Sequence, residues 1–122
     1  MNEKPVNGIV LFPNGTYERR QFKQLSDYQS AIGGRIEAVR LYDHTYEKEV
    51  ACMYVDEEGR LKEGAKINSV AGGISFLLNS EDYLLGNAVL VGASDSEGYD
   101  TDIPDWLVAF VNQVSRDVTP NV

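Results

Sequence analysis

The sequence Ala31-Ile-Gly-Gly-Arg-Ile-Glu-Ala-Val-Arg-Leu-Tyr-Asp43 combines a helix stop with a strand. Gly33 suits the left-handed position that ends many helices, and Gly34 gives the chain freedom to turn. After these glycines, apolar side chains recur at nearly every second position on both sides, as in a strand that is covered on both faces. We therefore expect residues 35–43 to form a central strand of a sheet.

One carboxylate lies inside this expected strand. Glu37 alternates in phase with Val39 and Leu41, so its side chain is expected to share their face and to be partly buried. A carboxylate in such a place most often accepts hydrogen bonds from the backbone or from an arginine. We predict a structural role for Glu37, with contact to a ligand as the alternative.

The residues before this stretch predict a hairpin followed by a helix. Residues 6–12 are rich in β-branched and aromatic side chains, residues 13–15 have strong turn chemistry, and residues 16–23 are polar enough for an edge strand. Residues 25–32 have the apolar spacing of a short helix, with Ser26 as its N-cap.

The residues after this stretch predict further strands. Residues 50–55 are apolar on both sides and indicate a second central strand. Gly59 then suits the left-handed position of a bulged hairpin, with a short return strand from residue 60 to residue 62. Residues 87–92 predict the final strand.

Asn68 is a good N-cap for a helix over residues 69–78. Gly72 and Gly73 lie inside that helix, and each costs about 1 kcal/mol relative to alanine. Close approach of the helix to a strand would offset this cost. The alternative is that backbone N–H groups of residues 69–73 bind a phosphate, although their spacing matches neither the P-loop nor the dinucleotide-binding fingerprint.

The last helix is expected to begin with Asp102 as its N-cap and Pro104 in its first turn. An apolar stripe follows at helical spacing, formed by Ile103, Trp106, Leu107, Phe110, Val111 and Val114. We expect this stripe to close the core. The alternative is that it docks a second copy and forms a homodimer.

Together these elements predict a single compact α+β domain over residues 1–122. We expect a mixed or antiparallel sheet of about five strands with three helices.

Charge is distributed unevenly along the chain, whose formal net charge is −8. Residues 1–66 have a net charge of −1, whereas residues 67–115 hold seven acidic residues and no lysine or arginine. Such an acidic region repels phosphates, so we expect no direct nucleic-acid binding and favour a basic partner. The acidic loop, residues 93–102, contributes Asp95, Glu97, Asp100 and Asp102. Their oxygens resemble the ligands of a calcium loop, but their order fails its pattern, so we expect a solvated loop and predict no metal site, with cation binding as the alternative. We predict that this loop contacts the partner.

The chain carries no signal of a membrane location. No apolar run approaches the roughly 18 residues of a membrane span, and residues 1–5 lack the layout of a signal peptide. Cys52 is the only cysteine, which excludes an internal disulfide and favours a small buried thiol. We expect a cytoplasmic protein.

Catalytic motifs are scarce. His44 is the only histidine, and no nucleophile elbow accompanies it. Glu37 paired with Asp43, or with an acidic residue of the acidic loop, would offer the two carboxylates of a hydrolase. We predict no enzyme, no catalytic residue and no cofactor, and keep this hydrolase as an alternative.

Four segments together resemble a known family: Gly33-Gly-Arg-Ile-Glu37, Met53-Tyr-Val-Asp-Glu-Glu-Gly-Arg-Leu61, Asn68-Ser-Val-Ala71 and Leu85-Gly-Asn-Ala-Val-Leu-Val-Gly92. The chain resembles, from about residue 9 to residue 92, an uncharacterised family of small bacterial and phage proteins known only as a domain of unknown function. The family's recurring positions correspond to Gly33, Gly34, Ile36, Glu37, Asp56, Gly59, Asn68, Ala71 and Gly86. Gly72-Gly73 and the residues from Ala93 onward depart from its pattern. The resemblance implies a phage or mobile-element setting without an established activity.

The leading functional hypothesis is a non-enzymatic binding protein of phage type, which acts on a host component in the host cytoplasm, with counter-defence as its setting. Its partner would be a host protein with a basic surface, bound by Asp95, Glu97, Asp100, Asp102 and Trp106. The alternative is a protein that sequesters a small anionic, nucleotide-like ligand, because glycines beside a helix N-terminus suit anions. The residues of that site would be Gly33, Gly34, Arg35, Glu37, Asn68 and Ser69.

Overall fold

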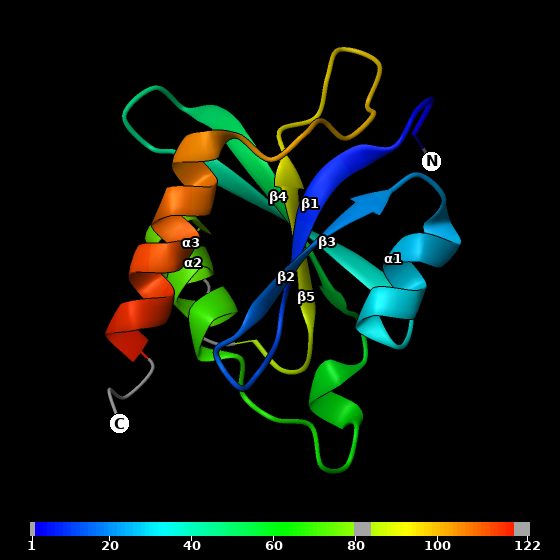
Figure 1. The fold of residues 1–122 in the computed structure, drawn as a ribbon, viewed down its shortest axis with the longest axis vertical. Helices are drawn as coiled ribbons and strands as arrows, with labels where there is room; N and C mark the ends of the chain where they lie inside the picture. Colours follow the sequence, from blue (N-terminus) through cyan, green and yellow to red (C-terminus); the bar gives the residue numbers. More distant parts are fainter. Residues whose placement is uncertain (1, 80–83, 119–122) are drawn as a thin grey trace.

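The computed structural model describes residues 2–79 and 84–118 and contains a five-stranded antiparallel sheet and three α-helices (Figure 1). The elements in chain order are β1 (Val6–Leu11), β2 (Tyr17–Phe22), α1 (Leu25–Ile32), β3 (Ile36–Asp43), β4 (Lys48–Asp56), a 3₁₀ helix η1 (Gly59–Leu61), α2 (Ser69–Asn79), β5 (Ala88–Gly92) and α3 (Asp105–Val118). The strands are ordered β2-β1-β5-β4-β3. The predicted α+β class is confirmed.

Helices cover both faces of the sheet. α2 and α3 lie on one face and α1 lies on the other (Figure 1). The central strand β5 is buried throughout, and its side chains alternate between the two layers. Leu90 packs in the larger core beneath α2 and α3, whereas Val89 and Val91 pack in the smaller core beneath α1.

The expectation that residues 35–43 form a central strand is wrong. Among the described residues β3 pairs with β4 alone, so it is an edge strand, and β5 occupies the centre. Val39 and Leu41 are buried on the α2 side, whereas Ala38 and Tyr42 are exposed on the other side. Strand order depends on pairing between distant segments, which local alternation does not report.

The expected bulged hairpin at Gly59 is also absent. Gly59 does not adopt a positive φ and instead begins η1, in place of the predicted return strand. A Cβ at this position would lie 3.3 Å from the carbonyl oxygen of Leu85. The glycine therefore permits a close approach between two backbone segments.

The N-terminus of α1 is capped by a different residue from the predicted Ser26. Gln24 is the N-cap, and Asp27 accepts hydrogen bonds from the backbone N–H groups of Gln24 at 3.0 Å and Lys23 at 2.9 Å. The backbone hydrogen bonds from Gln24 and then Lys23 lower the pKa of Asp27. The predicted helix end is confirmed, because Gly33 adopts the left-handed conformation with φ 83°.

α3 begins two residues later than expected. Asp102 is not its cap, because Oδ1 of Asp102 accepts a hydrogen bond of 2.7 Å from the backbone N–H of Asn7 on β1. The carbonyl oxygen of Pro104 accepts the first helical hydrogen bonds, from Leu107 and Val108. The chain is thus tied to β1 immediately before the helix starts.

The apolar stripe of α3 closes the core as predicted. Leu107, Val111 and Val114 are buried, whereas Trp106 remains 50% exposed. A Cβ on Gly73 of α2 would lie 3.2 Å from Val114, so this glycine serves contact with a helix and not the expected contact with a strand. None of the helices in the described ranges has the length and apolar character needed to cross a bilayer.

Candidate functional site

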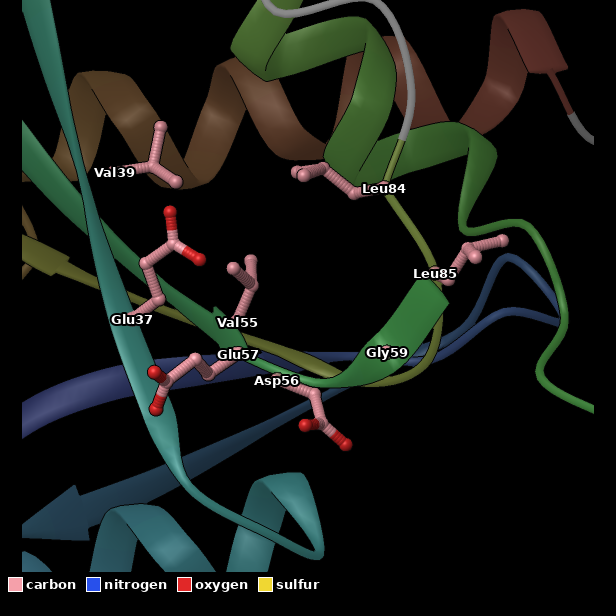
Figure 2. Close-up of a pocket in the computed structure, with 8 residues that line it drawn as sticks. All are labelled: Glu37, Val39, Val55, Asp56, Glu57, Gly59, Leu84 and Leu85. Atoms are coloured by element: carbon pink, nitrogen blue, oxygen red, sulfur yellow. The ribbon is translucent and has the colours of Figure 1, made fainter. Parts of the chain in front are cut away.

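A cleft of about 320 Å³ opens where β3 begins and β4 ends (Figure 2). Its apolar walls are formed by Val39, Val55, Leu84 and Leu85, and its acidic groups are Glu37, Asp56 and Glu57. These residues come from β3, from β4 with the turn that follows it, and from the segment that precedes β5. Three parts of the chain that are distant in sequence therefore meet at this cleft, which we call the Glu37 cleft.

Strand pairing positions Glu37 in the cleft. Glu37 lies opposite Val55 in the β3–β4 ladder and, as predicted, faces the same side as Val39. The expected partial burial is wrong, because Glu37 is exposed. The core stops at Val39, and a cleft replaces it at the start of the strand. Figure 2 shows the carboxylate of Glu37 directed into this space.

The carboxylates of the Glu37 cleft differ in their partners. Asp56 is largely buried and forms an ion pair with Lys62. By contrast, neither Glu37 nor Glu57 takes part in an ion pair within the described parts of the chain. Strand pairing between β3 and β4 brings Glu57 to the same cleft as Glu37. The cleft therefore carries negative charge that the described residues do not neutralise.

The two glycines of the Gly33-Gly34 motif form a structural junction. The Nζ of Lys62 donates a hydrogen bond of 3.0 Å to the carbonyl oxygen of Gly33 as well as contacting Asp56. A Cβ on Gly34 would lie 2.8 Å from that Nζ. The carbonyl oxygen of Arg35 accepts a hydrogen bond of 2.9 Å from the N–H of Glu57. This segment thus joins the end of α1 to the end of β4.

Asn68 is fully buried, and the polar atoms of its side chain form hydrogen bonds within the protein. Its Oδ1 accepts a hydrogen bond of 3.1 Å from the N–H of Ala71, which confirms the predicted N-cap. Its Nδ2 donates to the carbonyl oxygens of Leu11 and Gly86, both at 2.9 Å. Ser69 is exposed at the start of α2. Neither Asn68 nor Ser69 lines the Glu37 cleft.

The residues of the acidic loop are used in different ways. Asp100 is 6% exposed and accepts hydrogen bonds from the hydroxyls of Tyr28 and Tyr54. Oδ1 of Asp95 accepts from the backbone N–H groups of Glu97 and Tyr99, both at 2.9 Å, so Asp95 shapes the loop itself. Asp95 and Glu97 remain exposed, whereas Asp100 is buried.

The tyrosines that hold Asp100 belong to a buried network that sequence spacing did not reveal. Burial, together with the Asp100 carboxylate, raises the pKa of Tyr28 and of Tyr54. Cys52 lies in the same core, and burial raises the pKa of its thiol to about 11. The predicted buried cysteine is confirmed. A thiol in this state is protonated near neutral pH and unreactive.

The carboxylate pairs considered for a hydrolase do not meet. Glu37 and Asp43 lie six residues apart on β3, which corresponds to about 20 Å. Catalytic carboxylates of glycosidases are separated by roughly 5–9.5 Å. The acidic loop follows the end of β5 that pairs with Ala51, whereas Glu37 pairs with Val55 at the other end of β4. Within residues 2–79 and 84–118, no three acidic, histidine or cysteine side chains gather as metal ligands.

The fold and the cleft define a small α+β domain with an acidic, half-apolar cleft beside a sheet edge. The chain belongs to the family described as a domain of unknown function (DUF3846), whose model matches residues 6–116. This match confirms the family resemblance and extends beyond residue 92 through the acidic loop and most of α3. Neither the curated proteins nor the solved structures include a match to the chain.

Proposed function

We propose that this protein is a non-enzymatic binding protein that recognises a cationic group carried on an apolar stem. The observation that carries the proposal is the Glu37 carboxylate, which points into a cleft without an ion-pair partner among the described residues (Figure 2). An ammonium or guanidinium group would form a charge-assisted hydrogen bond with this carboxylate. Glu57 adds a second negative charge.

The apolar walls define the rest of the ligand. Val39, Val55 and Leu84 would pack against an aliphatic stem, as apolar surfaces do with the methylene groups of lysine. A volume of about 320 Å³ lies at the small end of the range for ligand pockets. The Glu37 cleft therefore suits one side chain or one small amine.

The same geometry favours a cation over the anionic ligand considered from the sequence. Glu37 and Glu57 would repel an anion. Asn68, whose helix start was expected to line the anion site, already donates its side-chain N–H groups to Leu11 and Gly86. The junction at Gly33 and Gly34 is likewise occupied by Lys62.

Our proposal places the protein in the cytoplasm of a host cell, as a phage or mobile-element protein that acts on a basic host component, with counter-defence as its role. The excess of negative charge over residues 67–115 supports a basic partner and disfavours direct binding to nucleic acid. The cationic group would then be a lysine or arginine side chain of that partner, and a free aliphatic amine is the other source of the same chemistry.

Titration of the protein with small ligands, monitored by ¹H–¹⁵N NMR, tests the Glu37 cleft. One arm uses 1,5-diaminopentane, a second uses a short lysine-containing peptide, and a third uses 1-pentanol, which has the stem without the charge. We expect saturable shifts at residues 37, 55, 57 and 85 with the amine or the peptide and none with the alcohol. Stronger binding of the peptide would indicate a protein partner, and stronger binding of the diamine would indicate a free amine.

Matched variants separate the site from general charge effects. Glu37→Gln removes the charge in the cleft and should abolish the shifts, whereas Glu97→Gln removes one charge from the exposed acidic loop and should leave them unchanged. Binding should also weaken as salt is raised from 0.05 to ~0.3 M. Equal binding by the Glu37→Gln variant, or equal shifts with 1-pentanol, would overturn the proposal.

A further inference from the structure

A second concave surface lies at the opposite end of the sheet from the Glu37 cleft. It has a volume of about 440 Å³ and lies between the β3–β4 turn, the end of β5 and the start of α3. Its side chains include Asp43, Tyr46, Lys48, Glu49, Asp102 and Trp106. In Figure 1 the β3–β4 turn and the first turn of α3 stand beside each other at this end of the molecule. We call this surface the aromatic groove.

Two large aromatic side chains of the groove are exposed to solvent. Trp106 is 50% exposed and Tyr46 is 77% exposed. Tryptophan and tyrosine are enriched among the residues that contribute most to protein interfaces. Their presence in one groove distinguishes this surface from isolated exposed apolar residues, which are normal.

The fold holds Trp106 outward. The neighbouring residues Leu107 and Val111 anchor α3 in the core. Just before the helix, Asp102 is tied to the backbone of Asn7, and the N–H of Ile103 donates a second hydrogen bond of 2.9 Å to the carbonyl oxygen of Asn7. The start of α3 is therefore hydrogen-bonded to β1, and these contacts together with core packing set the position of Trp106.

The charge of the aromatic groove favours a cationic occupant. The residues that line the groove include three carboxylates, those of Asp43, Glu49 and Asp102, and one cation, Lys48. Glu49 already pairs with Arg40 at 3.2 Å. Asp43 and Asp102 each accept a backbone hydrogen bond through Oδ1, and the other carboxylate oxygen of each has no hydrogen-bond partner in the described structure. Two carboxylates with a free oxygen thus lie in the same groove as two exposed aromatic rings.

We infer that the aromatic groove is a docking surface for an arginine-containing segment of a protein partner. The planar guanidinium group stacks on an aromatic ring and can also donate paired hydrogen bonds to a carboxylate, and lysine does not combine these two contacts. Trp106 supplies the ring, and Asp43 and Asp102 supply the carboxylates. This surface is separate from the Glu37 cleft, so the inference does not depend on the function proposed above.

A second copy of the chain is the competing occupant. The apolar residues of α3 that a homodimer would use, Leu107, Val111 and Val114, are buried in the core of their own domain. Little apolar surface beyond Trp106 and the half-buried Phe110 is left on the described part of α3. The groove therefore fits a basic segment better than it fits another α3.

Trp106 is the only tryptophan of the chain, so its fluorescence reports directly on the groove. The probe is a short Gly-Arg-Gly-Arg-Gly peptide. It is compared with two peptides of the same length in which lysine or citrulline replaces both arginines. The citrulline side chain keeps the planar shape of arginine without its charge. We expect a saturable change in emission with the arginine peptide, binding weaker by ~10-fold or more with lysine, and no response with citrulline.

Variants of the groove test the assignment. Asp102→Asn retains an oxygen that can accept from Asn7 while removing the charge, and Asp43→Asn does the same at the other carboxylate. Each should weaken binding by ~10-fold, and Tyr46→Ala should also weaken it. Glu63→Gln, at an exposed position outside the groove, should leave it unchanged. Calorimetry tests the contribution of the Trp106 ring to binding without relying on its fluorescence. The Trp106→Phe variant should bind the arginine peptide more weakly.

Three outcomes would overturn the inference. The first is equal binding of the citrulline peptide, and the second is unchanged binding by both Asp→Asn variants. The third is a dimer in light scattering that Trp106→Ala dissociates, combined with no binding of the arginine peptide, which would assign the groove to a second copy.

Discussion

The hydroxyl of Tyr54 donates a hydrogen bond of 2.8 Å to Oδ1 of Asp100, and this contact ties the acidic loop to an interior strand of the sheet. Tyr28 of α1 donates to Oδ2 of the same carboxylate at 2.5 Å. The N–H of Asp100 also donates to the side chain of Asn2. A residue that looked like part of a solvated loop is therefore a buried connection between the sheet, α1 and the N-terminal segment.

Removing one donor from this network should destabilise the protein. Tyr54→Phe leaves the buried Asp100 carboxylate with one tyrosine donor fewer, and hydrogen bonds to charged groups contribute about 1.5–3 kcal/mol. We expect the free energy of unfolding in urea to fall by that amount. Tyr46→Phe, at a position that is 77% exposed, is the control and should change it by less than ~0.5 kcal/mol. Equal effects of the two variants would contradict a structural role for the network.

Stability should fall in alkaline solution because of Cys52. Burial raises the pKa of its thiol from 9.0 to about 11, so the unfolded chain releases this proton at a lower pH than the folded chain. The stabilisation is complete below pH 9 and is lost as the pH rises through 11. By pH 10 the loss should be about 1 kcal/mol.

The measurement for Cys52 is the free energy of unfolding in urea at several pH values between 7.5 and 10. In the Cys52→Ala variant the decline that begins near pH 9 should be absent, whatever the absolute stability of the variant. Burial also raises the pKa of Tyr28 and of Tyr54 above the ordinary value of 10.0, so these tyrosines ionise near pH 10 only in the unfolded chain. They add to the decline close to pH 10, and they do so equally with and without Cys52. An identical decline in the variant would show that another group is responsible.

Asn68 should be sensitive even to replacement by another good N-cap. Asn68→Ser keeps an oxygen for the N–H of Ala71, but it removes both donors to the carbonyl oxygens of Leu11 and Gly86. We expect a loss of ~2 kcal/mol for Asn68→Ser and a larger loss for Asn68→Ala, measured by thermal unfolding. Ser69→Ala, at an exposed position, should have little effect. If Asn68→Ser were neutral, the role of Asn68 would be that of a cap alone.

Gly33 offers a test of backbone strain without steric clash. Its φ is 83°, and a Cβ there would meet nothing within 4 Å. Gly33→Ala should therefore destabilise the protein by about 1–2 kcal/mol through conformation alone. Asn tolerates the left-handed region better, so Gly33→Asn should be milder in chemical denaturation. Equal losses for the two variants would point to a cause other than φ.

The elements of the fold were predictable because they depend on nearby residues. The left-handed Gly33, the Asn68 cap and the polar edge strand β2 all agree with local patterns. The caps of α1 and α3 were wrong because several acceptors competed within a few residues. Asp102 is the clearest case, since a hydrogen bond to Asn7 across the fold replaced the local one.

The candidate site was predictable only in part. Alternation along β3 placed Glu37 on the same face as Val39, and this is what the structure shows. Its exposure, and its meeting with Glu57 and Leu84, depend on where β3 lies in the sheet and on how the segment before β5 returns. Nothing in the spacing of these residues reports either fact.

Sequence patterns among neighbouring residues were sufficient to predict the helices, most strands and the α+β class, because turn chemistry and side-chain periodicity act between residues close in sequence. Tertiary structure alone determined that β3 lies at an edge, that Glu37 faces a cleft and that Asp100 is buried while Trp106 is exposed. The physical reason is that these properties arise from contacts between distant residues. Tyr28 and Asp100, which share a hydrogen bond, are separated by 72 positions in the sequence.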